Sequence, residues 1–600
     1  MRIAHEMPFG AEVSGEGVRF SLWAPAARRV CLHVEDRPPR PMVRGADGFY
    51  TCFASDARAG DRYSFSFDGE PLRVADPASR FNPDGVHGPS QVVDPAAFEW
   101  QDDSRVGWPW RNAVFYELHV GAFTPEGTFA AAETKLEYLA ALGVTAVELM
   151  PVADGPGRRN WGYDGVLPFA VRPAYGRPED LKRFVQSAHR AGLMVFLDVV
   201  YNHFGPEGNY LHRYAPQFFT DRHKTPWGDA INFDGPESAP VREFFIHNAL
   251  CWLEEYRFDG LRLDAVHAII DDSEPDFLTE LAAAVRRLPG GERHLVLENG
   301  DNEARYLARG EDGRPRRYAA QWNDDFHHAA HVLLTSEKAG YYEDYEQPGR
   351  QLLRCLTEGF VYQGEPSKHW GGRPRGEPSA HLPPDAFVSF LQNHDQIGNR
   401  AHGERLWMLA ERASMRAAET LLLLLPAPIL LFMGDEFHAP NRFPFFCDFE
   451  GQLADAVTQG RRMEFAHFFE NVEDLASIPD PNDEATLGIA RLDWSAAARP
   501  EGTDAIERYT RLLALRRDVL MPLLPAGARR GRMLGDRALH VEWALGQGAT
   551  LVLVANFSAL PAPLGAWPDG ELVHSSVTLA APRPAEVPPW CASWFIRRRT

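Results

Sequence analysis

The stretch FDGLRLDAVH, residues 258–267, determines the fold that we predict for this chain. Side chains alternate along a strand, so Leu261 and Leu263 share one face while Arg262 and Asp264 share the other. A neighbouring cation keeps a carboxylate ionised, and an ionised carboxylate can act as a nucleophile. An aspartate after a strand is more often the N-cap of a following helix, so a catalytic role for Asp264 depends on the residues around it.

The order helix, glycine, short apolar strand recurs in the segments before this stretch and in the stretch itself. Eight strands are predicted, at residues 113–120, 146–152, 193–200, 259–265, 294–298, 317–322, 386–392 and 429–434. Eight such units are the number that closes a parallel barrel. We therefore predict a (β/α)8 TIM barrel, completed by a helix over 507–517.

Both flanks of the barrel show the two-residue period of antiparallel sheets. The N-terminal flank is expected to be a β-sandwich, followed by a Pro- and Gly-rich linker or strap at 76–95. The C-terminal flank is expected to be an antiparallel β domain, with LVLVANF (551–557) as one strand. The predicted domains are residues 1–97, 98–518 and 519–600.

The bulk properties exclude several partners. A formal charge of −21 disfavours nucleic acid and anionic membranes. The apolar run 421–433 is too short to cross a bilayer and is predicted to be a core helix leading into a strand. The first residues lack an apolar leader, so we expect a cytoplasmic protein, and the six scattered cysteines argue against disulfides or a zinc site.

The ends of the predicted strands carry the polar residues. In a barrel of this kind the active site forms from loops at the carboxyl ends of the strands. Four strands end in carboxylates and histidines there: Asp198, Asn202 and His203; Arg262, Asp264 and His267; Glu298; His394 and Asp395. Capping needs alone would hardly place the same chemistry on four strands.

These residues fit the cleavage of a glycosidic bond. One carboxylate must attack or stabilise the anomeric carbon, and one carboxylic acid must protonate the departing oxygen. Asp264 beside Arg262 suits the first role, and the negative charge of Asp264 would help Glu298 to keep the proton for the second. Adjacent strands would hold the two carboxyl groups about 5–5.5 Å apart, which predicts a retaining mechanism.

Aromatic residues in NWGYDG, after the second strand, are candidate sugar platforms. Trp161 and Tyr163 could stack on sugar rings, although a loop tryptophan plugs a core just as often. The chain lacks the GxSxG, HExxH and GxxxxGK[ST] motifs of other chemistries. We expect no cofactor and no catalytic metal.

DVVYNH, GLRLDAVH, the glutamate of VLEN and QNHD resemble, in this order, the four signature regions of the α-amylase family of retaining glycoside hydrolases and transferases. The resemblance implies that Asp264 is the nucleophile, Glu298 the general acid/base and Asp395 a third carboxylate that binds sugar hydroxyls. It places the remaining substrate-binding residues at Tyr163, Trp161, His203, Arg262, His267, His394 and Gln396. Asn202 matches a position where some members of the family keep a calcium ligand.

Longer stretches, such as 218–236, 392–406 and GRRMEF (460–465), resemble the members that hydrolyse the α-1,4 bond next to the trehalose end of maltooligosyltrehalose. Gly300 departs from their acidic residue in the third region. The segment Asn441 to Pro500, treated as a loop, is expected to shape the reducing-end subsites. The alternatives are a glycogen branching or debranching enzyme and a non-catalytic glucan-binding protein, which would typically have lost one of the three carboxylates.

Overall fold

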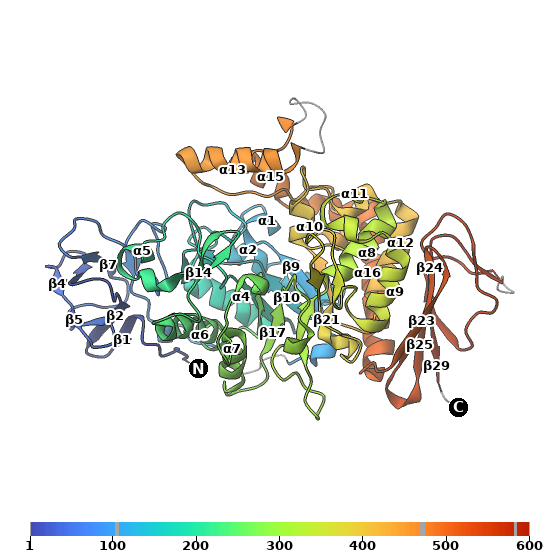
Figure 1. Cartoon of the computed structure of the whole chain (residues 1–600), viewed down its shortest axis with the longest axis horizontal. Helices are drawn as coiled ribbons and strands as arrows, with labels where there is room; N and C mark the ends of the chain where they lie inside the picture. The colour runs from blue at the N-terminus through green and yellow to red at the C-terminus, as the bar shows by residue number, and fades with distance from the viewer. Residues whose placement is uncertain (1, 102–106, 467–474, 581–584, 599–600) are drawn as a thin grey trace.

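The computed structural model describes residues 2–101, 107–466, 475–580 and 585–598. Figure 1 shows three parts in a row along the long axis: a β module at the N-terminal end, a barrel in the middle and a β domain at the C-terminal end. This is the predicted arrangement. None of the described helices is long and apolar enough to cross a membrane.

The N-terminal module is a sandwich of two four-stranded sheets, as its alternating sequence predicts. Val18, Phe20 and Leu22 of one sheet and Leu32 and Phe65 of the other are all buried. The strands are β1 (Gly10–Ser14), β2 (Gly17–Trp23), β6 (Phe49–Ala54) and β5 (Val43–Arg44) in the first sheet, and β4 (Arg40–Pro41), β3 (Val30–Val34), β7 (Arg62–Phe67) and β8 (Ser90–Gln91) in the second.

The predicted strap at 76–95 contacts the barrel through its first part, and its later part adds β8 to the sandwich. Arg80 in this segment is buried and forms an ion pair of 3.0 Å with the buried Glu255, which follows α6 (Ser238–Glu254). Phe81 forms a β-bridge to Val171. The pair leaves neither charge unpartnered in the interior, so the strap joins the module to the barrel through fixed contacts.

All eight predicted barrel strands are confirmed, and they pair in parallel in one sheet. A bridge between Ser389 and Ile429 brings the two ends of the sheet together, so the barrel closes. In sheet order the strands are β21 (Phe387–Val388), β18 (Ala320–Trp322), β17 (His294–Leu297), β16 (Gly260–Leu263), β13 (Met194–Val199), β10 (Ala146–Leu149), β9 (Val114–Leu118) and β22 (Ile429–Phe432).

Helices cover the outside of the barrel. Gly143 shows how a segment ends: its φ of +108° terminates the helix before β10, a conformation that glycine adopts without strain. The main helices are α3 (Leu136–Leu142), α4 (Pro178–Arg190), α6, α7 (Phe277–Arg286), α8 (Asp324–Thr335), α9 (Pro348–Glu358), α12 (Arg412–Leu423) and α16 (Pro500–Leu515). α16 begins earlier than the helix predicted over 507–517, whereas α12 and β22 confirm the core helix and strand of 421–433.

Two segments leave the barrel over its loop face. A hairpin of β14 (Phe219–Thr225) and β15 (Gly228–Ile231) follows β13. The segment 441–500 carries α13 (Gly451–Glu464) and α15 (Glu484–Ala490), which lie at the top of Figure 1, so treating it as a loop was wrong. Thr458 is the only buried residue of α13, so this helix lies outside the core. Residues 467–474 of this segment lie outside the described residues.

The C-terminal domain is a five-stranded antiparallel sheet with a small second pair of strands. Its strands are β23 (Arg529–Gly535), β24 (Ala538–Ala544), β25 (Thr550–Asn556), β29 (Cys591–Arg597) and β27 (Glu571–Ser575), with β26 (Ala562–Pro563) pairing β28 (Glu586–Val587). Trp594 is fully buried and donates a hydrogen bond of 3.0 Å from Nε1 to the carbonyl of Thr420 in α12. The predicted strand at 551–557 is β25.

Candidate active site

The polar residues of the rim meet around one guanidinium. Arg262 of β16 is 2% exposed, and its Nη1 lies 2.7 Å from Asp198 Oδ2 and 2.9 Å from Asp264 Oδ1. Its Nη2 lies 3.3 Å from Glu298 Oε2. The indole of Trp322 lies 4.1 Å from the guanidinium carbon, on the face of the group. One cation therefore holds carboxylates from three adjacent strands.

Asp264 is oriented by a second partner. The Nδ2 of Asn202 donates to Asp264 Oδ2 and to the Asp264 carbonyl, both at 2.8 Å. The next residue, Ala265, has a φ of +39°, which turns the chain away directly after the carboxylate. The Asp264 side chain is 13% exposed, so one part of it stays accessible.

Glu298 is held by the same turn. Its Oε2 accepts a hydrogen bond of 2.5 Å from the Ala265 backbone N–H, and its carbonyl accepts one of 3.0 Å from Val266. The sequence pairs Arg262 with Asp264 alone, whereas in the structure the guanidinium lies between Asp264 and Glu298. Both candidate catalytic carboxylates thus depend on β16 for their position.

A chain of hydrogen bonds runs behind Asp198. The Tyr163 hydroxyl donates to Asp198 Oδ2 at 2.6 Å and lies 2.9 Å from His394 Nε2. His394 Nδ1 contacts Glu117 of β9. Burial lowers the pKa of His394, but Glu117 outweighs burial and raises it. A protonated His394 donates from both ring nitrogens, which suits Glu117 on one side and the Tyr163 oxygen on the other.

Asp395 lies on α10 (His394–Gly398), which begins shortly after β21 ends. The side chain of Asn393 caps this short helix by accepting from the N–H groups of Asp395 and Gln396. Asp395 itself accepts from Asn399 Nδ2 at 2.7 Å. Burial raises the pKa of Asp395, and the nearby His394 lowers it.

The other predicted site residues differ in their exposure. Trp161 is 4% exposed and stacks on Phe443 with the ring of His394 against its edge, so it supports His394 from behind. His267 lies at the open side, where its Nδ1 accepts from the Gly300 N–H at 3.1 Å. Gln396 donates from Nε2 to Asp324.

Several residues around the site are not among those predicted from the sequence. Trp227, at the tip of the β14–β15 hairpin, stacks on His203 with ring centroids 4.8 Å apart and remains 50% exposed. Asp324 follows β18 and lies in the same pocket as Asp395. The ending of β18, QWNDD, carried the signal for Asp324, whereas no local pattern marked Trp227.

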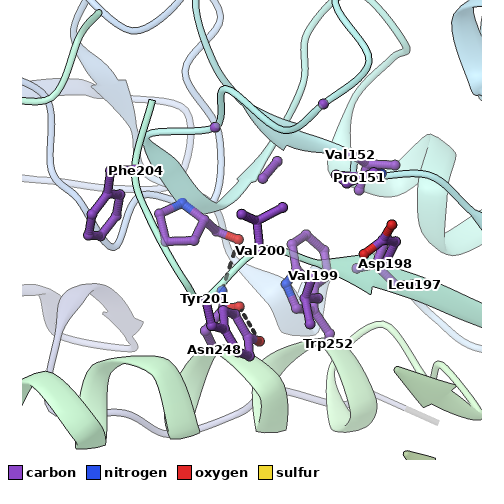
Figure 2. Close-up of a pocket in the computed structure, with 14 residues that line it drawn as sticks. Pro151, Val152, Leu197, Asp198, Val199, Val200, Tyr201, Phe204, Asn248 and Trp252 are labelled. Atoms are coloured by element: carbon purple, nitrogen blue, oxygen red, sulfur yellow. Dashed lines mark hydrogen bonds between the residues drawn. The ribbon is translucent and has the colours of Figure 1, made fainter. Parts of the chain in front are cut away.

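Two cavities lie near these residues. The first, behind Asp198 and against α6, encloses about 20 Å³ and is lined mainly by apolar side chains such as Val199 and Trp252 (Figure 2). It can hold little more than one water molecule, so it is not a sugar site. The second encloses about 150 Å³ beyond Asp395 and is lined by Gly300, Asp324, His328, Tyr341, Asp344, Tyr345, His369, Trp370, Arg375, Asp395 and Gln396.

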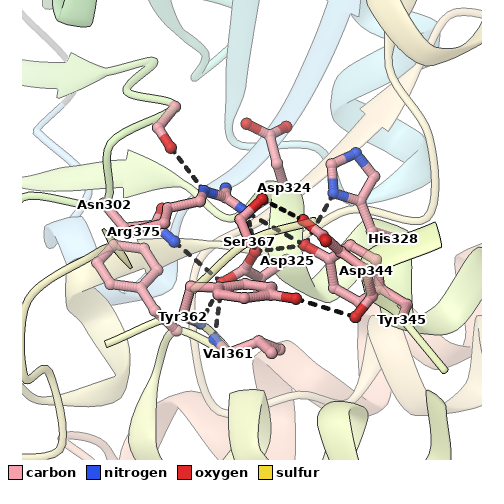
Figure 3. Close-up of polar contacts among 12 residues, drawn as sticks. Asn302, Asp324, Asp325, His328, Asp344, Tyr345, Val361, Tyr362, Ser367 and Arg375 are labelled. Atoms are coloured by element: carbon pink, nitrogen blue, oxygen red, sulfur yellow. Dashed lines mark hydrogen bonds and ion pairs between the residues drawn. The ribbon is translucent and has the colours of Figure 1, made fainter. Parts of the chain in front are cut away.

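The outer wall of the second cavity is formed by the segment 341–375. Arg375 ties this wall to the barrel, since its Nε donates to the Gly300 carbonyl at 2.7 Å and its Nη1 lies 3.0 Å from Asp325 Oδ1. Figure 3 shows the Arg375 Nη1 contact converging on Asp325 together with those of Tyr345, Val361 and Tyr362. A side chain on Gly300 would reach within 3.4 Å of His267 and Trp370, so the glycine leaves the cavity open at that point.

The residues around Asn202 do not fit a calcium site. Its Nδ2 is directed at Asp264, and its Oδ1 contacts His203 Nδ1, so the amide oxygen already has a partner. Within the described ranges, only His223, Asp234 and Asp272 are grouped closely enough to hold an ion. His223 and the Asp272 N–H already bind Asp234, at 2.8 and 3.0 Å, so protein contacts account for this group.

Known proteins match the chain over nearly its whole length. Family models match residues 8–79 (carbohydrate-binding module 48, isoamylase N-terminal domain), 93–229 (α-amylase catalytic domain) and 526–594 (a domain of unknown function). The malto-oligosyltrehalose trehalohydrolase of Saccharolobus solfataricus is 40% identical over 85% of this chain and 87% of its own, and that of Deinococcus radiodurans is 43% identical over 84% and 82%. The chain belongs to the malto-oligosyltrehalose trehalohydrolase family.

Membership of the trehalohydrolase family makes the chain a glycoside hydrolase of the α-amylase type. A crystal structure of a Salmonella typhimurium protein described as an α-amylase superposes with a TM-score of 0.94 at 40% identity, covering 99% of this chain and all of that one. The glycogen branching enzyme of Bacillus caldolyticus is 34% identical over only 47% of this chain and 46% of its own. The trehalohydrolase likeness thus extends over parts of the chain that the branching-enzyme likeness does not reach.

Proposed function

We propose that the chain hydrolyses the α-1,4-glucosidic bond next to the trehalose end of maltooligosyltrehalose, releasing trehalose and a maltooligosaccharide with retention of configuration. The observation that carries the chemistry is the position of Arg262 between Asp264 and Glu298. This arrangement brings an ionised nucleophile and an acid to one point of the rim, as a retaining glycosidase requires. The relatives' names support the substrate.

In this mechanism Asp264 attacks the anomeric carbon while Glu298 protonates the departing oxygen. The contacts from Asn202 and Arg262 leave Asp264 no freedom to turn away, so its carboxylate is preorganised for attack. Glu298 then takes a proton from the water that releases the sugar from Asp264. Asp395 would bind hydroxyls of the sugar ring and oppose the positive charge of the transition state.

The leaving group of this reaction is trehalose, and we place it in the cavity beyond Asp395. That cavity combines a tryptophan, Trp370, with polar groups on Asp344 and His369, a lining that suits a sugar. The residues that line it come from 300–375 and from α10, so the contribution that we predicted for 441–500 to the reducing-end subsites stays a separate proposal. We also propose the domain boundaries after residues 97 and 518.

Maltooligosyltrehalose and a plain maltooligosaccharide of equal length, incubated separately with the enzyme, test the substrate. Trehalose should be released from the first much faster than any sugar is released from the second. NMR of the product's anomeric form tests the retention of configuration. Equal rates on both substrates, or transfer of chains to new branches, would contradict the proposal. A Glu298→Gln variant in parallel should show neither reaction.

A further inference from the structure

Two neighbouring aspartates, Asp324 and Asp325 at the start of α8, have opposite surroundings. Asp325 is fully buried and accepts hydrogen bonds from five groups. The donors are Arg375 Nη1, the Tyr345 hydroxyl, the Val361 and Tyr362 N–H groups and Asn302 Nδ2, at 2.5–3.1 Å. An ionised carboxylate with this many donors is a structural anchor.

Asp324 has almost none of this support. Within the described part of the chain its one hydrogen-bond donor is Gln396 Nε2, at 3.2 Å. In Figure 3 its carboxyl group points away from the Asp325 network, and it lines the same cavity as Asp395. It does not serve as the helix cap either, because the side chain of Asn323 accepts from the Phe326 N–H and fills that role.

The charges around Asp324 favour its protonated form. Burial raises its pKa to about 8, with further increases from Glu298, Asp395 and Asp325, while Arg375 lowers it. Of the other groups in the cavity, burial keeps the pKa of His328 well below its usual range, so His328 adds no positive charge. The dipole of α8 favours an anion at this end, but burial and three carboxylates oppose it.

We propose that Asp324 is a further substrate-binding residue, whose carboxylic acid O–H donates a hydrogen bond to an oxygen of the sugar bound in the cavity beyond Asp395. This rests on the proposed function, because the sugar in that cavity is the trehalose leaving group. Glu298 and Asp395 can supply acceptors on this side of the rim. A neutral carboxyl adds a donor there without adding another negative charge.

Two variants separate a donor from an acceptor. Asp324→Asn keeps an N–H donor at every pH, whereas Asp324→Leu has a similar volume and no donor. Steady-state kinetics between pH 5 and 9 should show Asp324→Asn within about threefold of wild type at pH 6 and without the decline that wild type shows above about pH 8. Asp324→Leu should lose about tenfold in kcat/KM, the value of one hydrogen bond to a substrate, mainly through KM.

Asp569→Asn, an exposed aspartate in the C-terminal domain, is the matched control and should change nothing. Thermal unfolding midpoints for all variants separate misfolding from lost binding. An Asp324→Asn variant as impaired as Asp324→Leu would overturn the donor role, and an Asp324→Leu variant equal to wild type would overturn any contact with substrate.

The series is run on maltooligosyltrehalose and on maltoheptaose, and the Asp324 variants are compared on whichever substrate the wild type cleaves. A wild type that does not prefer maltooligosyltrehalose contradicts the proposed function. The ratio of kcat/KM between the Asp324→Asn and Asp324→Leu variants still decides the role of Asp324.

Discussion

The carboxylates on the two sides of the catalytic rim differ in their ion-pair partners. On the β16 side, Asp198, Asp264 and Glu298 share one buried guanidinium. On the cavity side, Asp324 and Asp395 have no ion-pair partner within the described residues, and burial raises the pKa of each. Burial also raises the pKa of Asp198, to about 7, although Arg262 lowers it. The difference between the two sides is therefore the shared cation, which positions three carboxylates on one side and none on the other.

The largest expected effect comes from removing the charge that attacks. Asp264→Asn should lower kcat by about 10⁴-fold or more, because it deletes a group needed in the chemical step. Glu298→Gln should do the same by removing the proton donor. Circular dichroism and the unfolding midpoint should match wild type, and near-normal turnover in either variant would contradict the proposed mechanism.

Removing the guanidinium of Arg262 should destabilise the β16 side of the rim. Arg262→Met leaves Asp198, Asp264 and Glu298 together without their partner, and we expect a loss of about 3–5 kcal/mol in the free energy of unfolding. The loss should be smaller at pH 5 than at pH 7, since protonation relieves the repulsion. Denaturant unfolding at the two pH values measures this, with exposed Arg350→Ala as the control.

The stability of the Asp324→Asn variant relative to wild type should increase as pH rises. Burial raises the pKa of Asp324 in the folded protein to about 8, above its ordinary value of 3.8, which applies to the unfolded chain. Its contribution to stability is therefore complete below pH 4 and is lost as pH rises to 8. The Asn variant has no such loss. Its stability relative to wild type should therefore grow by at least about 1.4 kcal/mol, one pKa unit, between pH 5 and pH 8.

Tyr163→Phe should have a smaller effect on the β16 side of the rim than Arg262→Met has. It removes the hydrogen bond of 2.6 Å to Asp198 and the contact with His394 while keeping the ring. We expect a loss of about tenfold in kcat/KM, the usual value of one such bond. An unchanged rate would show that Arg262 alone is enough to position Asp198.

The smallest expected effect is at the hairpin. Trp227→Ala removes an exposed ring stacked on His203, and we expect about 0.5–1.5 kcal/mol in substrate binding, read as a rise in KM with little change in kcat. Trp227→Phe should restore most of the loss. An equal loss in both variants would indicate that the hairpin itself has moved.

The sequence predicts the barrel well because each strand carries its own signal. An apolar run at or after a glycine is enough to place β10, β13 and β16, and the strand ends then place the carboxylates on one rim. Trp227 and Arg375 could not be predicted, since their positions depend on where long segments fold back. Asp324 follows the three-residue strand β18, and its raised pKa comes from burial and from Glu298 and Asp395, which are distant in the sequence.

The buried pair of Arg80 and Glu255 limits how the protein can be cut or recombined. Lys182 lies 3.6 Å from the same carboxylate, and the His5 N–H also donates to it. A truncation that deletes the N-terminal module would leave Glu255 at the barrel surface without its guanidinium, and a graft from another protein would have to supply one. The module and the barrel should therefore be exchanged as one piece when chimeric enzymes are built.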